Sequence, residues 1–296
     1  ILKKILRQRN VKFGTDKLGL KYCDFLTNMA VVPTKKWAIH RIYDSIITNG
    51  LLNTTYVIVS VFYQKFVCND IDDFVLTICK DRLSKYEPLF LSYEYIECHS
   101  WEYDEYLSIE DKTAKDENYI VFIDQNIPHH PEVIENKLLV NWVDKYYHQL
   151  NSLFDNIEQK YKKRIIISPH PTSNIELLKE KFSGREVSLD GSKILTKNSS
   201  FVLSYSSGAL NYAVIFNKQV IFITDDKFKK NIIGKATEEF SKSINQKLID
   251  LSSVGYDIEL EKIDNRAYRN YEKNNITKCS KNLNKNWDIF YDNYIK

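Results

Sequence analysis

Short apolar runs alternate with helical segments along the second half of the chain. Residues 119–124, 164–168, 201–205 and 219–224 are short, apolar and rich in β-branched or aromatic side chains, which is typical of buried strands. Parallel strands need crossover connections, and helices usually supply them. The alternation therefore predicts an α/β fold in which a parallel sheet is covered on both faces, as in a Rossmann-like domain.

The helical segments between these runs differ in length. Residues 138–161 carry apolar side chains at helical spacing and predict one long helix. Thr172 to Asn174 can cap the helix that follows the second strand. Further helices are expected at residues 175–182, 191–198, 207–217 and 235–246, and a short strand near 186–189.

The first half of the chain is less regular but of the same α/β type. Helices are expected at 38–52 and 73–83, and strands at 55–63 and 89–98. The acidic and polar residues 102–118 are expected to link two domains. The sequence therefore predicts an N-terminal α/β domain (1–110), a Rossmann-like domain (119–262) and a helical tail (263–296) that packs back across the domains.

The charge balance argues against one class of partner. The 296 residues include 42 Lys and Arg and 39 Asp and Glu, which gives a net charge of +3. A nucleic-acid binder needs a clustered basic face, so no nucleic-acid partner is expected. The short basic runs at 160–164 and 227–230 are interpreted as solvated surface. Attraction to anionic membrane lipid or to a phosphorylated ligand is the alternative, so peripheral membrane association stays open.

The cysteines and the hydropathy predict an intracellular environment. Five cysteines lie far apart, which predicts reduced thiols in a cytosolic protein, with the inner face of the cell membrane as an alternative location. No apolar run reaches the ~18 residues that a membrane span requires. The first residue is Ile, which leaves open that a further N-terminal segment precedes it.

Polar residues follow three of the predicted strands. Ligands of open parallel sheets bind beyond the carboxyl ends of the strands, so these residues are expected to meet at one edge. After the third strand, Ser206, Ser207 and Gly208 stand where a helix begins, and free N–H groups with serine hydroxyls form a phosphate site there. Asn211 is placed to reach the same ligand. A simple helix cap by serine is the alternative.

Two further strand ends carry residues suited to acid–base chemistry. His170 lies between two prolines that fix its position, and it can donate to a phosphate or protonate a leaving group. Asp124, followed by Gln125, can act as a general base or orient a ligand hydroxyl. An idle turn histidine and a turn-forming aspartate are the alternatives.

Other motifs carry less chemistry. His129 and His130 are adjacent and make a poor pair of metal ligands, so no metal is expected. Asp70, Asp72 and Asp73 resemble a cation-binding Asp-x-Asp motif, but capping of the helix that follows is the preferred interpretation. Asp225 and Asp226 are interpreted as a turn. The sequence lacks the glycine patterns of P-loop and dinucleotide-binding proteins and the Gly-x-Ser-x-Gly elbow of serine hydrolases.

The pairs His170-Pro171 and Ser206-Ser207, in this order of strands, resemble motifs of bacterial sialyltransferases and related transferases that use CMP-activated sugars. The resemblance covers roughly residues 119–225. It implies a GT-B fold, in which two Rossmann-like domains face a cleft, and it makes residues 1–110 the acceptor-side domain. It also implies metal-independent catalysis, with no cofactor besides the CMP-sugar donor. His170 and Pro171 would hold the CMP phosphate together with Ser206 and Ser207, and His170 would help CMP to leave.

The resemblance predicts transfer of a sialic acid-like or Kdo-like sugar to an oligosaccharide or glycolipid during synthesis of a bacterial surface polysaccharide. One departure concerns the acceptor base, because the acidic triplet that these enzymes carry in the first domain is absent. Asp124 is the candidate base, with Glu94 or Glu97 as alternatives. A CDP-glycerol- or UDP-sugar-dependent transferase of the same fold stays open, as does a non-catalytic nucleotide-binding protein.

Overall fold

The computed structural model describes residues 14–16, 74–77, 95–129, 142–253, 255–277 and 284–294. The chain divides into two compact units, of which one comprises residues 1–99 and 286–296 and the other residues 100–285. The predictions for 38–52, 55–63 and the acidic residues 70–73 lie outside the described residues. The domain limits expected from the sequence (1–110, 119–262 and 263–296) concern independent folding and stay predictions.

The first unit contains a small parallel sheet. Strands β1 (Gly14–Asp16), β2 (Phe74–Thr77) and β3 (Tyr95–Glu97) pair in that order. The strand expected at 89–98 thus contains β3. The helix expected at 73–83 is wrong at β2, because hydrogen bonds to β1 and β3 on both sides outweigh the local helical spacing. Helix α13 (Asn286–Tyr294) belongs to the same unit.

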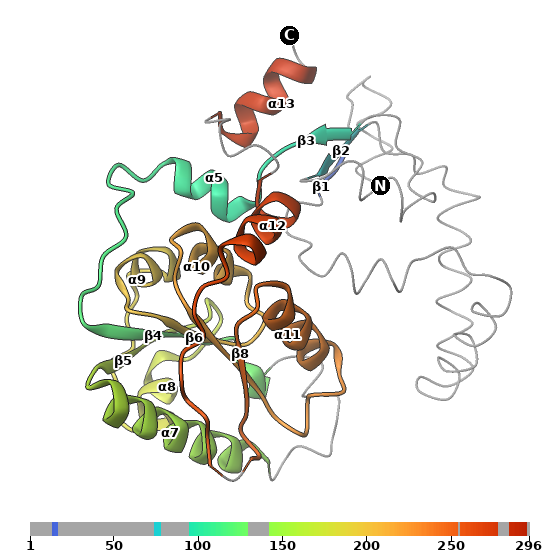
Figure 1. Ribbon diagram of the computed structural model, residues 1–296. Helices are drawn as coiled ribbons and strands as arrows, with labels where there is room; N and C mark the ends of the chain where they lie inside the picture. The colour runs from blue at the N-terminus through green and yellow to red at the C-terminus, as the bar shows by residue number, and fades with distance from the viewer. Residues whose placement is uncertain are drawn as a thin grey trace, which may run out of the picture. The chain divides into compact units, whose positions relative to one another are not determined.

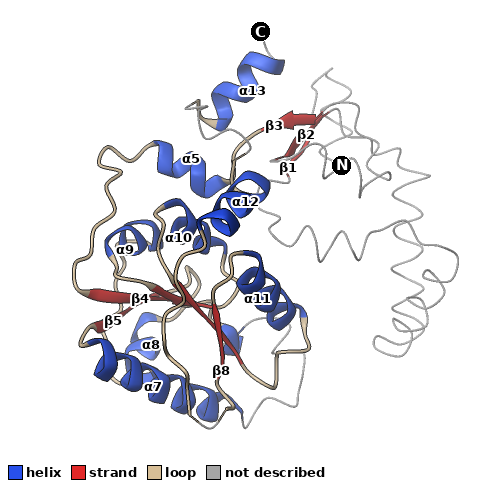
Figure 2. Cartoon of the chain, viewed as in Figure 1, coloured by secondary structure: helices blue, strands red, loops and turns tan. Residues whose placement is uncertain are grey.

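The second unit is built on a five-stranded parallel sheet, and its α/β, Rossmann-like prediction is confirmed (Figures 1 and 2). Its strands are β4 (Tyr119–Ile123), β5 (Arg164–Ser168), β6 (Val202–Ser204), β7 (Val220–Thr224) and β8 (Lys247–Asp250). They lie in the order β5-β4-β6-β7-β8. The chain leaves β4 toward one side and returns to β6 on the other. The carboxyl ends of β4 and β6 therefore flank the switch point at which such sheets bind ligands.

Two hydrophobic cores lie on the two faces of this sheet. Helices α7 (Trp142–Tyr161) and α8 (Ile175–Lys181) cover one face, where Phe122 packs against Phe154 with ring centroids 5.0 Å apart. Val121, the preceding residue of β4, points into the opposite core. This alternation follows from the two-residue period of a strand and explains why β4 is apolar throughout.

Several helices cover the second core (Figure 1). They are α5 (Trp101–Leu107), α9 (Ser192–Asn198), α10 (Asn211–Ile215), α11 (Ile232–Ser243) and α12 (Asn265–Asn275). Two short 3-10 helices, η1 (Ile127–His129) and η3 (Gly208–Leu210), follow β4 and β6. Helices on both faces of a parallel sheet were the sequence prediction.

Some elements differ from the prediction. Residues 102–118 do not form a plain linker, because α5 buries Tyr103 in the second core. The helix expected at 207–217 is split into η3 and α10, and near 186–189 a single bridge joins Val187 to Ile167. Helix α11 starts at residue 232 rather than 235. Gly234 permits the earlier start, since a Cβ there would lie 2.3 Å from the carbonyl oxygen of Phe228.

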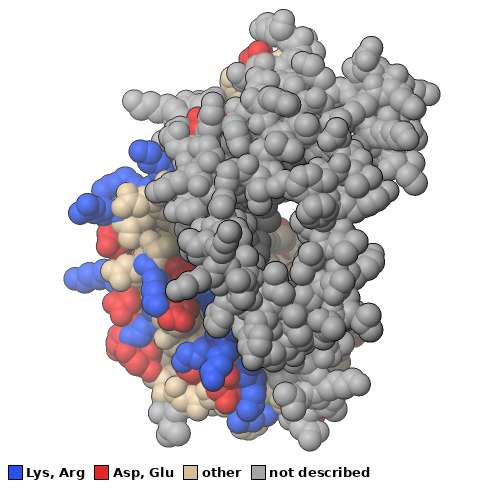
Figure 3. All heavy atoms as spheres, turned by 90° about the vertical axis from the view of Figure 1, so that its right-hand side faces the viewer, with Lys and Arg blue, Asp and Glu red and all other residues tan. Residues whose placement is uncertain are grey.

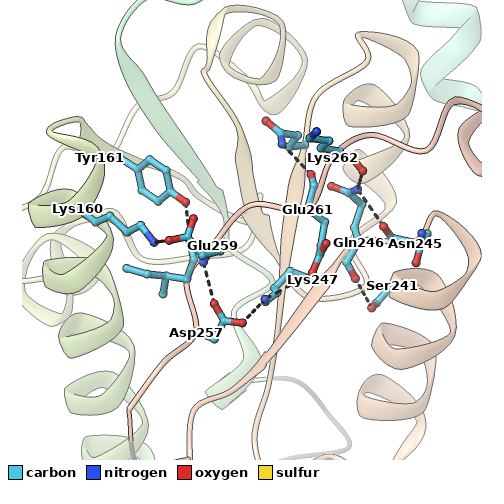
Figure 4. Close-up of polar contacts among 12 residues, drawn as sticks. Lys160, Tyr161, Ser241, Asn245, Gln246, Lys247, Asp257, Glu259, Glu261 and Lys262 are labelled. Carbon is cyan, nitrogen blue, oxygen red and sulfur yellow. Dashed lines mark hydrogen bonds and ion pairs between the residues drawn. The ribbon is translucent and has the colours of Figure 1, made fainter.

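Strand β8 and the segment after it were not predicted. The main chain from Leu251 onward follows α7: Gln149 Nε2 donates to the Leu251 carbonyl oxygen (2.8 Å), and the Tyr161 hydroxyl donates to the Ile258 carbonyl oxygen (2.6 Å). Ion pairs of Lys160 with Glu259 and of Lys247 with Asp257 and Glu261 hold this segment (Figure 4). Residues 255–263 thus close the side of the first core beside α7.

The surface of the described residues mixes the two signs of charge. In Figure 3, Lys and Arg lie interspersed with Asp and Glu over the coloured part of the visible face. This distribution agrees with the balanced composition. Among the described residues, the helices are all too short or too polar to cross a membrane.

Candidate functional site

The three strand ends singled out in the sequence lie on adjacent strands at one edge of the sheet. Ile123, the last residue of β4, pairs with Ser168 of β5 on one side and with Ser204 of β6 on the other. The backbone N–H of Asp124 donates to the Ser168 carbonyl oxygen (2.9 Å), and the Ser204 hydroxyl donates to the Ile123 carbonyl oxygen (2.9 Å). The edge is therefore held in one register up to the residues where the loops begin.

Asp124 is a buried carboxylate that is only half satisfied. Its side chain is 4% exposed, and Oδ1 accepts from the backbone N–H of Asn126 at 3.0 Å. Oδ2 has no hydrogen-bond partner among the described residues. Burial raises the pKa of Asp124 to about 6, because the charged form loses water that the protein does not replace. Such a group is ready to accept a proton or a ligand hydroxyl near neutral pH.

Gln125 adds a second acceptor at the same strand end. Its Oε1 atom is buried and has no partner among the described residues. Buried acceptors without donors are costly unless a ligand or water satisfies them. Asp124 Oδ2 and Gln125 Oε1 together therefore favour a ligand that donates hydrogen bonds, as sugar hydroxyls do.

His170 lies at the surface, in the loop after β5. Its Nδ1 receives the Thr172 backbone N–H at 3.3 Å and lies 2.8 Å from Thr172 Oγ1. A backbone N–H can only donate, so Nδ1 is an acceptor, and we assign the ring proton to Nε2. The exposed Pro171 stiffens this turn. Nε2–H is therefore a hydrogen-bond donor that suits an anionic oxygen.

The turn Ser206–Ser207–Gly208 follows β6 and lies at the same edge. Ser206 is 1% exposed, whereas Ser207 and Gly208 are half-buried. Ser207 Oγ accepts from the Ala209 backbone N–H (3.2 Å), and the Ser207 carbonyl oxygen accepts from the Leu210 backbone N–H (3.1 Å). Ser207 is thus a helix cap, as the alternative interpretation held. Capping uses a lone pair and leaves the hydroxyl proton of Ser207 able to donate to a ligand.

Asn211 does not fit the ligand-binding role expected for it. Its side chain is fully buried, and its amide donates to Glu102 Oε2 at 3.0 Å. Its carbonyl oxygen accepts from the Tyr271 hydroxyl at 3.2 Å. Because the protein itself uses both ends of the amide, Asn211 holds helices together and is not retained among the ligand contacts.

The sequence interpretation missed a buried polar cluster beneath this edge. Asp225, directly after β7, is 1% exposed and accepts from Trp142 Nε1 at 3.1 Å, and burial raises its pKa to about 6. Beside it, the hydroxyls of Tyr146 and Tyr205 lie 2.5 Å apart. Asp225 does begin a turn, since its carbonyl oxygen accepts from the N–H groups of Phe228 and Lys229. The sequence could have indicated this role, because Asp225 directly follows a buried strand, as Asp124 does.

The structure describes only one of the two adjacent histidines. His129 Nδ1 lies 2.8 Å from Asn126 Oδ1, and His130 lies outside the described residues. In the part of the chain that the structure describes, no group of three His, Cys, Asp or Glu side chains is placed to hold a metal ion.

Comparisons with known proteins add no argument about the fold or the activity. No protein-family model matches the chain, and no curated protein matches its sequence. Among solved structures, it is similar to the UDP-GlcNAc 2-epimerase of Methanocaldococcus jannaschii in complex with UDP-GlcNAc and UDP, with a TM-score of 0.36 and 14% identity. That match covers 60% of this chain and 50% of the epimerase chain. At this similarity the match says nothing about a shared site or activity.

Proposed function

We propose that this protein is a glycosyltransferase that uses a nucleotide-activated sugar and requires no metal ion. One observation carries the proposal. The ends of β4, β5 and β6 bring two donors, His170 Nε2–H and the Ser207 hydroxyl, to the same sheet edge as a buried, half-satisfied carboxylate, Asp124. The switch point between β4 and β6 is where a parallel sheet of this order binds ligands.

The donors suit the leaving phosphate. Departure of a nucleoside phosphate from a sugar concentrates negative charge on the phosphate oxygens. Donors that are fixed in advance stabilise this charge, and one such donor contributes ~3 kcal/mol in a site that excludes water. In the proposal, His170 Nε2–H and the hydroxyls of Ser206 and Ser207 donate to that phosphate, and the hydrogen bond from the Ala209 N–H holds the Ser207 hydroxyl in place.

The acceptor atoms suit the sugar or the attacking hydroxyl. Asp124 Oδ2 is buried without a partner, and burial raises its pKa to about 6, within the range useful for a general base. In the proposal Asp124 takes the proton of the acceptor hydroxyl, and Gln125 Oε1 accepts from a hydroxyl of the bound sugar. We take CMP as the nucleotide on the motif resemblance, and CDP-glycerol and UDP-sugars are the alternatives. Synthesis of a surface polysaccharide, at the inner face of the membrane, belongs to the same proposal.

A nucleotide screen tests the binding part. CMP, CDP, UDP, GDP and ADP are added separately and thermal unfolding is followed. A ligand at 100 times its Kd adds ~2.7 kcal/mol to the free energy of unfolding. Stabilisation by CMP alone supports the proposed donor, and a preference for UDP favours the alternative. If all five leave the melting temperature unchanged, the proposed function is wrong.

Replacement of His170 separates catalysis from binding. His170→Ala removes the donor to the leaving phosphate, so turnover is expected to fall about 100-fold while nucleotide affinity falls only a few-fold. His148→Ala is the matched control, because His148 is exposed on α7. Transfer is measured with each CMP- or UDP-sugar that binds, with and without EDTA, which is expected to leave the rate unchanged.

A non-catalytic nucleotide-binding protein is the second candidate, and the exposed position of His170 favours it, because a donor in contact with water stabilises a leaving phosphate less than a donor in a site that excludes water. It predicts nucleotide binding with no transfer and with hydrolysis no faster than in buffer. An identical rate for wild type and His170→Ala would likewise support this second candidate.

A further inference from the structure

The buried side chain of Asn211 joins three elements at the end of the turn after β6. Its Nδ2 donates to Glu102 Oε2 of α5 at 3.0 Å and approaches Ser100 Oγ at 3.5 Å. Its Oδ1 accepts from the hydroxyl of Tyr271 of α12 at 3.2 Å. Asn211 is itself the first residue of α10. A single amide thus connects α10 with α5 and α12.

Two partners of Asn211, Ser100 and Tyr271, are themselves held in place. Ser100 is the N-cap of α5 and the first residue of the second unit, and its backbone N–H donates to the Ile276 carbonyl oxygen at 2.7 Å. The ring of Tyr271 stacks on Phe240 of α11, with centroids 4.6 Å apart and planes 11° from parallel. The amide therefore meets partners whose positions are set by separate contacts.

The turn proposed to bind phosphate leads directly into Asn211. Residues 208–210 form η3, and the Leu210 N–H donates to the Ser207 carbonyl oxygen, so one tight turn separates Ser207 from Asn211. So short a connection allows little independent movement of Ser207 and Asn211. A displacement of Asn211 must therefore displace the Ser207 hydroxyl and the backbone around Gly208.

We propose that Asn211 is a positioning residue: it fixes the turn Ser206–Gly208 and couples it to α12 and to the start of α5, where the chain enters the second unit. The ligand part of this statement rests on the proposed function. Coupling is reciprocal, so a ligand that orders the turn also stabilises the start of α5. A buried amide with both ends engaged favours one geometry over others, because each lost partner leaves a costly unsatisfied group.

Two matched variants of α12 test the proposal. Tyr271→Phe removes the hydroxyl that donates to Asn211, whereas Tyr268→Phe removes a buried hydroxyl from the same helix that donates to the Lys218 carbonyl oxygen at 2.8 Å. Hydrogen exchange is measured on the ligand-free full chain, with urea unfolding as the check on global stability. The amides of residues 207–210 and 101–104 are expected to exchange about 3- to 10-fold faster in Tyr271→Phe than in Tyr268→Phe.

Equal exchange in the two variants at both segments overturns the proposal. The hydrogen-exchange comparison needs no ligand. Its result therefore tests the positioning role of Asn211 even if the nucleotide screen shows that the proposed function is wrong. If CMP or UDP binds, a second arm compares affinities: Tyr271→Phe is expected to weaken binding about 3- to 10-fold relative to Tyr268→Phe. Equal affinities, with faster exchange only at residues 101–104, would show that Asn211 supports α5 and not the turn, and would also overturn the proposal.

Discussion

At the scale of single residues, two aspartates at strand ends are buried and have raised pKa values. Asp124 and Asp225 follow β4 and β7, are 4% and 1% exposed, and have pKa values raised to about 6 by burial. Asp225 has the Trp142 indole as a donor, whereas Oδ2 of Asp124 has no partner among the described residues. Polar groups kept buried at a stability cost concentrate at functional sites, which is why Asp124 carries the proposed base role.

The pKa of Asp124 gives a prediction about stability. In the unfolded chain the carboxyl ionises near its ordinary value of 3.8, but in the folded protein only near 6. As pH rises between these values, the unfolded state loses a proton that the folded state keeps, so the free energy of unfolding falls. The gain in stability from Asp124→Asn should therefore be larger at pH 8 than at pH 4, by about 2–3 kcal/mol.

Urea unfolding of wild type and variant across this pH range measures the effect. Asn retains an oxygen for the Asn126 N–H, so that hydrogen bond is kept in the comparison. A difference between the two proteins that does not change with pH would show that Asp124 is not desolvated in the folded state.

At the scale of elements, Arg185 joins the loop after α8 to α7. Its side chain is 9% exposed, and its Nη2 atom lies 2.5 Å from Asp155 Oδ1 and 2.8 Å from Glu158 Oε2. Its Nη1 atom donates to Asn151 Oδ1 at 2.9 Å, and the guanidinium lies over the ring of Phe154. Glu158 also accepts from the backbone N–H of Ile165, at the start of β5. One guanidinium thus fixes the packing of α7 on the sheet.

Arg185→Ala is expected to lower the free energy of unfolding by about 2–3 kcal/mol, because it leaves Glu158 partly buried without its cation. Arg185→Lys should recover only part of this loss, since an ammonium cannot reproduce the planar fork. Denaturant unfolding provides the measurement.

Arg164→Ala serves as the control for Arg185, because the pair of Arg164 with Glu186 is 66% and 47% exposed. An exposed pair contributes about 0–1 kcal/mol. Equal losses at both positions would mean that burial does not distinguish the two arginines.

At the scale of the whole molecule, both large cores lie within residues 100–285. The second core includes Tyr103 of α5 and Tyr268 and Tyr271 of α12, which lie outside the predicted domain 119–262. Helices α5 and α12 therefore pack into the same core as the sheet.

A fragment of residues 100–285 is expected to fold alone and to unfold in one cooperative step, because its cores are complete. The fragment 119–262 should lose that cooperativity or aggregate, since removal of α5 and α12 exposes the apolar side of α10 and α11. Circular dichroism and calorimetry of both fragments provide the test. Cooperative folding of the shorter fragment would support the domain limits predicted from the sequence.

The sequence by itself determined the features that depend on local patterns. The apolar runs of β4 to β7, the long helix α7 and the α/β class follow from the spacing of neighbouring side chains, as does the meeting of three strand ends at one edge. Strand β8 was not found, because four residues with a charge at each end carry little pattern. Strand β2 was mistaken for a helix, because its pairing partners are far away in the sequence.

Only the tertiary structure decided what individual polar residues do. Asn211 has the spacing of a ligand contact, yet partners more than 50 residues away use its amide. Asp225 has the sequence context of a turn, yet Trp142 and the strands around it bury its carboxylate. Burial and hydrogen bonding are set by segments that meet only in the folded chain, so no local pattern can reveal them. The periods of strands and helices, in contrast, follow from the spacing of apolar side chains among neighbouring residues.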